Sequence, residues 1–340
     1  MVNVTFYTRK NCHLCDEIKA ELRTLEETHP HQLVEIDIDS DPALIASYGE
    51  TIPVIEVGPY ILHAPISRQD LVMTIGAAID RQDQLLKVGD DLYKKRAQHG
   101  RKMTGADKFS LWFSSRYMLV FSLILFFYAG LPVLAPVLMK AKVTAPAKII
   151  YKIYSPLCHQ FGFRSFFLFG EQPYYPLVET GIAGPGTNLI DFESATGILN
   201  LGDPSSPTRW EARSYIGDEE VGYKTALCER DIAIYGAMLL FALIFWATGH
   251  RIPPLHWAIW IFFGLGFIGL DGFSQIISQF QFSFFAKILP YRESTPFLRV
   301  FTGFLFGFTT AWFGFPYIEE SMRETRQIYI KKNAIIQAQK

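Results

Sequence analysis

The chain has 340 residues, of which 49% are hydrophobic, a high share for a wholly soluble protein. Its net charge of -1 gives no electrostatic reason to expect nucleic acid as a partner. Four cysteines are too few for a fold held together by disulfides, but two of them have the spacing of a redox motif. The chain starts with a strand pattern and shows no basic, apolar leader, so we expect the N-terminal part to stay in the reducing cytosol.

The first 80 residues predict a small soluble α/β domain. Short β-rich runs at 3–7, 33–38, 53–57 and 60–63 alternate with helical stretches at 12–25, 42–48 and 67–79. In the first helical stretch, Leu14, Ile18 and Leu22 recur on one face. The predicted element order is therefore β-α-β-α-β-β-α.

Cys12 and Cys15 form a CxxC motif where the first strand passes into the first helix. A sulfur at a helix N-terminus faces unpaired amides and the positive end of the helix dipole, which favour the thiolate. Arg9, Lys10 and His13 add positive charge close by. Cys15 lies one turn further on, within reach of a mixed disulfide on Cys12. The alternative is half of a zinc site, but no second CxxC or nearby histidine pair completes it, which favours redox chemistry.

Pro53 opens the third strand pattern and is either an edge residue or a cis-proline facing the CxxC motif. With the Cys-His-Leu-Cys-Asp run at 12–16 and the Ile-Asp-Ser-Asp run at 38–41, this pattern resembles the glutaredoxin-like branch of the thioredoxin fold over about residues 2–80. The resemblance implies Cys12 as the nucleophile, Cys15 as the resolving thiol and Pro53 as the cis-proline. It implies no bound cofactor, and a thiol or disulfide partner that is either a protein or glutathione. No glutathione-binding signature distinguishes the two.

From Leu111 onward the chain predicts an all-α membrane domain. A helix needs about 20 residues to cross the apolar core of a bilayer. Four mostly apolar stretches approach that length, at 111–139, 232–248, 255–277 and 300–318. Pro132 and Pro136 are expected to kink the first span near its far end. The short link at 249–254 requires the second and third spans to form an antiparallel hairpin.

An even number of spans places both ends of the chain on one side of the membrane. Basic residues precede the first span and follow the fourth: Lys94, Lys95, Arg96, Arg101, Lys102 and Lys108, then Arg323, Arg326, Lys331 and Lys332. The positive-inside rule therefore favours cytosolic N- and C-termini in the inner membrane of a prokaryotic cell, although the other side carries basic residues too, Lys287 and Arg292 among them. The expected domains are a glutaredoxin-like domain at 1–88, a basic linker at 89–110, a membrane domain at 111–320 with a long outer loop at 141–231, and a cytosolic tail at 321–340.

The outer loop begins with a stretch at 143–154 that predicts an amphipathic helix on the membrane surface. Its later part, 177–223, is rich in Gly, Pro, Ser and Asp, and we expect it to loop out and return. The Gly-rich run at 181–186 lacks the Lys-Ser/Thr ending of a phosphate loop, so nucleotide binding is not expected there.

A second group of chemically active residues flanks the outer loop and the spans. It comprises Cys158-His159-Gln160, Arg164-Ser-Phe, Cys228 with Arg230 and Asp231, Asp271 with Gln275, and Arg292 with Arg299. This set resembles a family of predicted prokaryotic membrane proteins of unknown function, over about residues 115–318. In many members a further cysteine stands where this chain has Asp231, which counts against a site with four thiolate-type ligands. The family resemblance implies no particular chemistry.

Three interpretations of this group remain open. Cys158, His159, Cys228 and Asp231 offer two thiolates, an imidazole and a carboxylate, a donor set suited to Zn²⁺. Alternatively, Cys158 and Cys228 form a disulfide on the oxidising side of the membrane. The third interpretation is that these residues only pack the ends of the spans. We expect Cys158, His159, Cys228 and Asp231 to converge at the outer membrane surface in either of the first two cases.

Asp271 and Gln275 are polar residues within the third apolar span. A carboxylate there costs about 2.5–3.5 kcal/mol on insertion scales, so Asp271 should face the bundle interior. Arg292 or Arg299 is expected to neutralise it, and Arg164 and Arg230 to neutralise other acids nearby. The role of Asp271 is either helix packing or the binding of a ligand or proton.

Two functions therefore compete. The first is a membrane-tethered thiol–disulfide oxidoreductase. The second is a metal- or small-ligand-binding membrane protein, a transporter or sensor, regulated by the redox domain. The predicted spans contain no cysteine, so a thiol relay across the bilayer from Cys15 to Cys158 has no intermediate sulfur.

Overall fold

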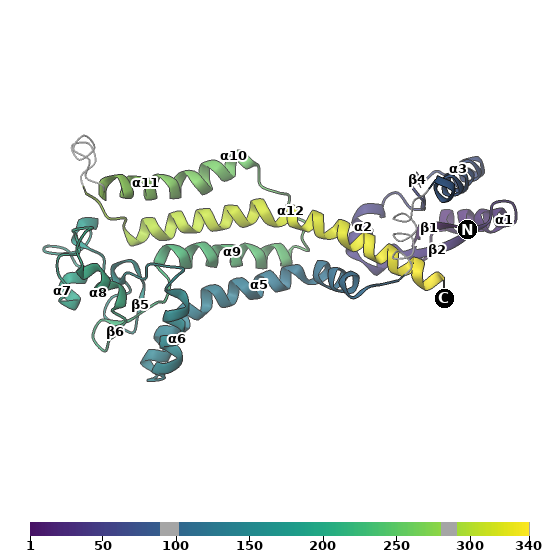
Figure 1. The fold of residues 1–340 in the computed structure, drawn as a ribbon. Helices are drawn as coiled ribbons and strands as arrows, with labels where there is room; N and C mark the ends of the chain where they lie inside the picture. The colour runs from purple at the N-terminus through teal and green to yellow at the C-terminus, as the bar shows by residue number, and fades with distance from the viewer. Residues whose placement is uncertain (89–101, 280–290, 340) are drawn as a thin grey trace. The chain divides into compact units, whose positions relative to one another are not determined.

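The computed structural model describes residues 1–88, 102–279 and 291–339 (Figure 1). The described chain forms two compact units, one of Met1–Tyr117 with Glu319–Lys340 and one of Met118–Ile318. Most of the expected basic linker, and Lys287 on the other side, lie outside the described residues. The domain boundaries expected from the sequence therefore stay predictions.

The N-terminal unit is built on a four-stranded mixed sheet with the strand order β2-β1-β3-β4. Its strands are β1 (Val2–Thr8), β2 (His31–Asp37), β3 (Val54–Val57) and β4 (Tyr60–His63), and its helices are α1 (His13–Leu25), α2 (Pro42–Tyr48) and α3 (Arg68–Val88). β1 pairs in parallel with β2 and antiparallel with β3. This is the thioredoxin-like arrangement expected from the β-α-β-α-β-β-α order.

Both faces of this sheet are covered, because successive side chains of a strand point to opposite sides. Phe6 of β1 packs with Leu22 of α1 and Leu71 of α3. Tyr7, the next residue, packs on the other face with Leu44 of α2. The CxxC motif at the start of α1 therefore packs against a closely packed hydrophobic core.

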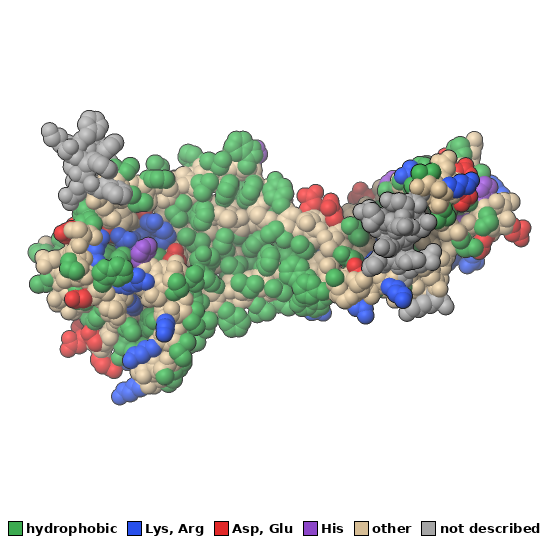
Figure 2. All heavy atoms as spheres, viewed as in Figure 1, with side chains coloured by type: hydrophobic (Ala, Val, Ile, Leu, Met, Phe, Trp, Pro, Cys, Tyr) green, Lys and Arg blue, Asp and Glu red, His purple; other side chains and the backbone are tan. Residues whose placement is uncertain are grey.

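Within the described residues, four helices are long and apolar enough to cross a membrane, as the sequence predicts. They are α5 (Gly105–Lys140), α9 (Glu229–Ala247), the stretch Trp257–Gln279 and α12 (Pro296–Ala338). The third consists of α10 (Trp257–Ile259), a π-helical turn η4 (Trp260–Gly266) and α11 (Phe267–Gln279). Hydrophobic side chains cover these helices on the face drawn in Figure 2, which suits a lipid environment.

Three prolines lie inside these helices, and the backbone carbonyl that each one frees finds another donor. Proline has no N–H, so the carbonyl four residues earlier loses its helical partner. The Tyr128 carbonyl, freed by Pro132, accepts from the Tyr154 hydroxyl at 2.9 Å. The Pro132 carbonyl, freed by Pro136, accepts from the Ala226 N–H at 3.1 Å. The Trp312 carbonyl, freed by Pro316 of α12, accepts from the Leu255 N–H at 3.5 Å. These hydrogen bonds attach neighbouring segments to the helices, and α5 continues as a helix through Pro132 and Pro136.

Two glycines of α12 allow α9 to approach closely. A Cβ on Gly307 would lie 2.1 Å from the Ile234 carbonyl oxygen, and one on Gly303 would lie 2.7 Å from that of Arg230. This Gly-x-x-x-Gly spacing is typical of tightly packed membrane helices. It holds the first turns of α9 against α12.

The segment between α5 and α9, which the sequence analysis expects to be an outer loop and which is called the outer segment below, is folded. Its elements are α6 (Thr144–Tyr154), η2 (Gly162–Arg164), β5 (Phe167–Leu168), η3 (Val178–Thr180), α7 (Phe192–Thr196), α8 (Thr208–Ser214), β6 (Gly217–Asp218) and β7 (Gly222–Lys224). The strands form a small sheet in the order β5-β7-β6. The prediction that 177–223 loops out is wrong, because Leu177, Phe192 and Val221 pack on Phe163 and Phe167 in one core. Phe163 and Phe167, upstream of this stretch, are buried by these contacts. A turn-rich composition gives no sign of such packing.

Candidate functional site

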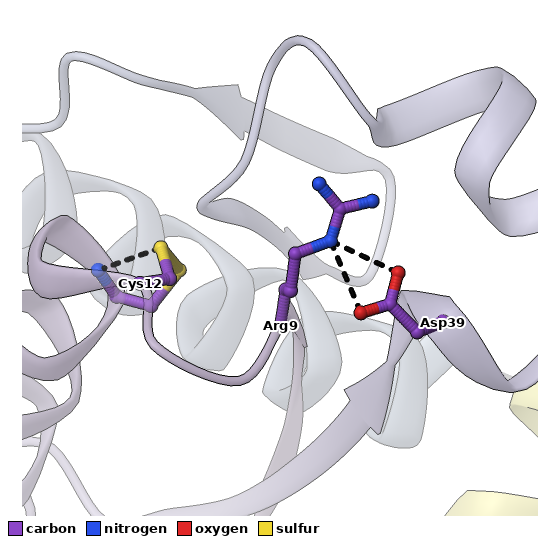
Figure 3. The surroundings of a disulfide bond; sticks show 4 residues. Arg9, Cys12 and Asp39 are labelled. Carbon is purple, nitrogen blue, oxygen red and sulfur yellow. Dashed lines mark hydrogen bonds and ion pairs between the residues drawn. A yellow bond between two sulfur atoms is a disulfide. The ribbon is translucent and has the colours of Figure 1, made fainter.

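The first pair of cysteines is held by the start of α1. Cys12 has extended backbone angles and is the N-cap residue, and its Sγ accepts a hydrogen bond from the Cys15 N–H at 3.3 Å. The two cysteines form a disulfide (Figure 3). Cys15 is 2% exposed and belongs to the domain core, whereas Cys12 is half-buried. Cys12 is therefore the more accessible sulfur of the pair.

The basic residues near Cys12 are mostly paired with acids. The Arg9 Nε donates to both carboxylate oxygens of Asp39, at 2.9 and 3.1 Å (Figure 3). The His13 Nδ1 lies 3.2 Å from a carboxylate oxygen of Glu17. Lys10 has no acidic partner among the described residues. The positive charge that the sequence suggested around Cys12 is thus largely offset. The N-terminus of α1 is then the main feature that stabilises a thiolate at Cys12.

The Ile52–Pro53 peptide bond is cis, as expected. Ile52 packs against the same core as Cys12 and Cys15. The Ala64–Pro65 bond is also cis, which sequence reasoning did not anticipate. The role of Pro53 in catalysis stays a prediction.

The second pair of cysteines meets in the other unit, together with one carboxylate. Ligand atoms of Cys158, Cys228 and Asp231 all lie within 4.8 Å of one another, and both thiols are free. Cys228 is the N-cap residue of α9, and Asp231 follows in its first turn. His159 is not part of this group, since its exposed ring stacks on Phe161 with centroids 5.8 Å apart. The structure thus brings together three of the four ligands expected from the sequence.

Gln160 joins the two segments that carry these cysteines. Its buried side-chain amide donates to the Tyr151 carbonyl at 3.0 Å and to the Ala226 carbonyl at 2.8 Å. The Lys224 Nζ donates to the Gln160 carbonyl at 2.6 Å. These bonds hold the loop after α6 against the residues before α9, which explains why glutamine follows Cys158-His159.

The two thiols are not equivalent. A hydrogen bond with Cys228 lowers the pKa of Cys158 against the opposing effect of burial. The same bond, together with burial, raises the pKa of Cys228 well above its ordinary value. The Gln160 N–H also points to the Cys158 Sγ, at 3.5 Å. Cys158 is therefore the sulfur that ionises first.

Asp271 is neutralised by two arginines. Arg230 approaches one carboxylate oxygen at 2.5 Å and Arg292 the other at 2.7 Å. The Ser294 hydroxyl donates to Asp271 at 2.6 Å. The expectations for Arg292 and Arg230 are therefore met, but Arg299 pairs elsewhere.

Glu293 is the second buried anionic centre, and the sequence analysis did not identify it. Its carboxylate lies 2.7 Å from the Arg164 Nε, also pairs with Arg299, and accepts from the Gln275 amide at 2.7 Å. Burial by itself raises the pKa of Glu293, but Arg164 and Arg299 outweigh it and hold that pKa below its ordinary value. Arg299 is also 3.7 Å from Glu229, another buried acid. Arginines outnumber acids among the sequence candidates near the spans, and this imbalance was the signal that further acids are buried there.

A cavity of about 240 Å³ opens beside the second cysteine pair. Its lining includes Cys158, His159, Cys228, Asp231, Gln275 and the three arginines Arg164, Arg230 and Arg299. All the polar candidates named from the sequence thus line this cavity except Asp271, which pairs with Arg230, and Arg292, which pairs with Asp271.

Two family models match separate parts of the chain. Residues 3–76 match the model described as "Glutaredoxin-like domain (DUF836)". Residues 219–313 match the model described as "Predicted membrane protein (DUF2085)". The chain is a fusion of a glutaredoxin-like domain and a predicted membrane-protein domain. No curated protein and no solved structure matches it.

The glutaredoxin-like match contains Cys12, Cys15 and Pro53. The membrane-protein match contains Cys228, Asp231, Asp271 and Glu293, but it begins after Cys158 and Arg164. The second site therefore combines residues inside the matched region with residues contributed by the outer segment.

Proposed function

We propose that the chain is a membrane-bound thiol–disulfide redox protein whose reactive centre is Cys12 with Cys15. One observation carries the proposal: Cys12 caps α1 with its Sγ bonded to the Cys15 N–H, and the buried Cys15 forms a disulfide with it. A helix N-terminus stabilises the thiolate of the attacking cysteine. A glutaredoxin-like domain supplies the matching fold.

In the reaction, the Cys12 thiolate attacks one sulfur of a partner's disulfide. The partner's S–S bond breaks, its other sulfur leaves as a thiolate that takes up a proton, and Cys12 enters a mixed disulfide. The Cys15 thiol then loses its proton and attacks the Cys12 Sγ. This step releases the partner's second sulfur and leaves the Cys12–Cys15 disulfide, which a dithiol protein or two glutathione molecules reduce again.

The test uses the full chain with Cys158→Ser and Cys228→Ser, so that only the reactive pair remains. After reduction, Cys12 should be alkylated first near neutral pH, and Cys12→Ser should abolish reduction of a glutathione–peptide mixed disulfide. Equal and slow alkylation of Cys12 and Cys15 would contradict the assignment of the nucleophile.

We further propose a multi-pass arrangement in a prokaryotic inner membrane with both termini in the cytosol. The support is the even number of apolar helices and the basic residues that flank the first and last of them. Intact cells treated with a membrane-impermeant thiol reagent provide the measurement. Cys12 should stay unlabelled, and labelling of Cys12 from outside would overturn the topology.

The group of Cys158, Cys228 and Asp231 favours a second function, the binding of a divalent metal, with zinc as the first candidate. The membrane unit would then be a metal-dependent transporter or sensor regulated by the redox domain. Metal analysis of the purified protein should find one zinc per chain, lost in Cys158→Ser. A Cys158–Cys228 disulfide in protein purified without reductant, with no metal, would replace this proposal by the disulfide alternative.

A further inference from the structure

The second site has three protein donors, and zinc takes four ligands. Cys158, Cys228 and Asp231 bring their ligand atoms within 4.8 Å of one another. Zinc sites with three protein ligands keep the fourth position for water or an exogenous ligand. In this chain the residues that supply the donors also line the cavity of about 240 Å³, so the fourth position has room for such a ligand.

The charges around this cavity favour an anion. Three of the charged side chains in its lining are arginines, and Asp231 is the acidic one. Among the described residues, Arg164 holds Glu293 through two nitrogens and Arg299 pairs with two acids, whereas Arg230 makes one such contact. Its terminal nitrogen pairs with Asp271, but its buried Nε has no hydrogen-bond partner in the described part of the chain. Arg230 also lies between Cys228 and Asp231 in the sequence and lines the same cavity as both.

We propose that the metal at Cys158, Cys228 and Asp231 takes a small oxyanion, a phosphate or short carboxylate, as its fourth ligand, with Arg230 binding the same anion. The inference rests on the proposed metal site and names what that site binds. The planar guanidinium matches the oxygens of these anions. The cavity is smaller than those that enclose drug-sized ligands, which favours a small free anion.

The competing occupant of the fourth position is the His159 imidazole, because His159 lines the same cavity. Its ring is instead stacked on Phe161. A lipid phosphate could supply the same oxyanion chemistry as free phosphate. The experiment must therefore separate an imidazole, a free anion and a lipid headgroup.

The full chain is loaded with Co²⁺ in place of zinc in nanodiscs of zwitterionic lipid, and inorganic phosphate is added while the Co²⁺ absorption is recorded. We expect one Co²⁺ per chain, lost in Cys158→Ser and kept in His159→Ala. Phosphate should shift the ligand-field bands in a saturable way. Arg230→Met should weaken phosphate binding about tenfold or more while Co²⁺ stays bound, and Arg230→Lys should recover part of it. Arg251→Met, which removes an exposed arginine of the α9–α10 link, is the matched control and should bind phosphate like the parent.

The outcomes separate the two proposals. Absence of bound Co²⁺ overturns the metal site and the anion proposal with it. Bound Co²⁺ with a spectrum that changes in His159→Ala and ignores phosphate overturns the anion proposal alone. A shift produced by phosphatidylglycerol discs without phosphate also overturns it, because the ligand is then a lipid headgroup.

Discussion

The two cysteine pairs share a local position but differ in their bonding and in the residues around them. Cys12 and Cys228 are each the N-cap residue of a helix and have extended backbone angles. The partner of Cys12 lies in the first turn of the same helix, and the two form a disulfide. The partner of Cys228 comes from the loop after α6, both thiols are free, and a carboxylate joins them. Both helix N-termini carry a cysteine, but the two sulfurs differ in state: Cys12 is bonded to Cys15, whereas the hydrogen bond with Cys158, together with burial, raises the pKa of Cys228 well above its ordinary value.

The ion pairs around the two cysteine pairs differ in how far they are exposed to solvent. The Arg9–Asp39 pair near Cys12 is substantially exposed, so water screens it. The pairs of Glu293 and Asp271 beside the second site are largely removed from solvent. The surroundings of the first pair can therefore change at little cost, whereas those of the second are fixed by buried charge.

Removing the second cysteine of each pair should show the largest difference between the two sites. Cys15→Ser leaves a mixed disulfide on Cys12 with no resolving thiol, so treatment of the reduced chain with oxidised glutathione should convert nearly all of it to an adduct. Cys228→Ser should leave Cys158 with only background adduct if that site binds metal. Mass spectrometry of proteolytic peptides locates each adduct. Equal adducts on Cys12 and Cys158 would make both pairs redox centres.

Removal of a buried charge should show the next largest effect. Glu293→Gln leaves Arg164 and Arg299 without their shared anion and should cost about 3–5 kcal/mol of unfolding free energy. Its surface counterpart, Asp39→Asn, should cost less than about 1 kcal/mol. Denaturant titration with alkylation of one cysteine measures each unit separately, with the partly buried Cys228 reporting for Glu293 and the reduced, buried Cys15 for Asp39. Similar costs for the two variants would show that burial adds nothing to these ion pairs.

The glutaredoxin-like domain and the four apolar helices were predictable from sequence because their signals are local. The CxxC spacing fits within one helical turn, and apolar length alone marks a span. The convergence of Cys158 with Cys228 was also predicted, since both border the outer loop. The free state of both thiols and the loss of His159 from the group required the structure.

Pairing between distant side chains was predictable only in part, because it depends on how each helix is rotated about its axis. Arg292 or Arg299 was expected to neutralise Asp271, and Arg292 does so, whereas Arg299 lies at Glu293 and Glu229. The prediction that 177–223 loops out was wrong for another reason. Its Gly-rich composition suggested a loop, whereas Phe192 and Val221 are needed to cover the aromatic residues before it.

The close packing of α9 on α12 offers a smaller test of how firmly Cys228 is held. Gly307→Ala places a methyl group against the Ile234 carbonyl and should cost about 1–3 kcal/mol. Gly314→Ala is the matched control in the same helix, since nothing lies within 4 Å of its added Cβ. The control should be neutral or stabilising by about 0.5–1 kcal/mol. Protection of Cys228 from alkylation measures both variants, and equal protection would mean that the helices separate without cost.

Lys224 should produce a pH dependence confined to the unit with the second pair. Lys224 is 1% exposed, and burial lowers its pKa from 10.5 to about 7. Its Nζ donates to the Gln160 and Arg213 carbonyls, which match the two N–H groups of a neutral amine. The unfolded chain holds this proton up to the ordinary pKa, so unfolding takes up a proton between pH 7 and 10.5. Stability from this group therefore rises with pH in that window and is level below pH 7.

The readout is the difference in unfolding free energy between the parent chain and Lys224→Met. Methionine cannot donate to either carbonyl, and this adds a constant cost at every pH. On top of that cost, the difference should grow by about 1 kcal/mol per pH unit from pH 7 to 9, since one pKa unit corresponds to about 1.4 kcal/mol. Lys148→Met, at an exposed position of α6, is the control and should show no such growth. A difference that stays flat with pH would mean that Lys224 keeps its charge when buried, and the link from Gln160 to the second cysteine pair would then be an ammonium rather than an amine.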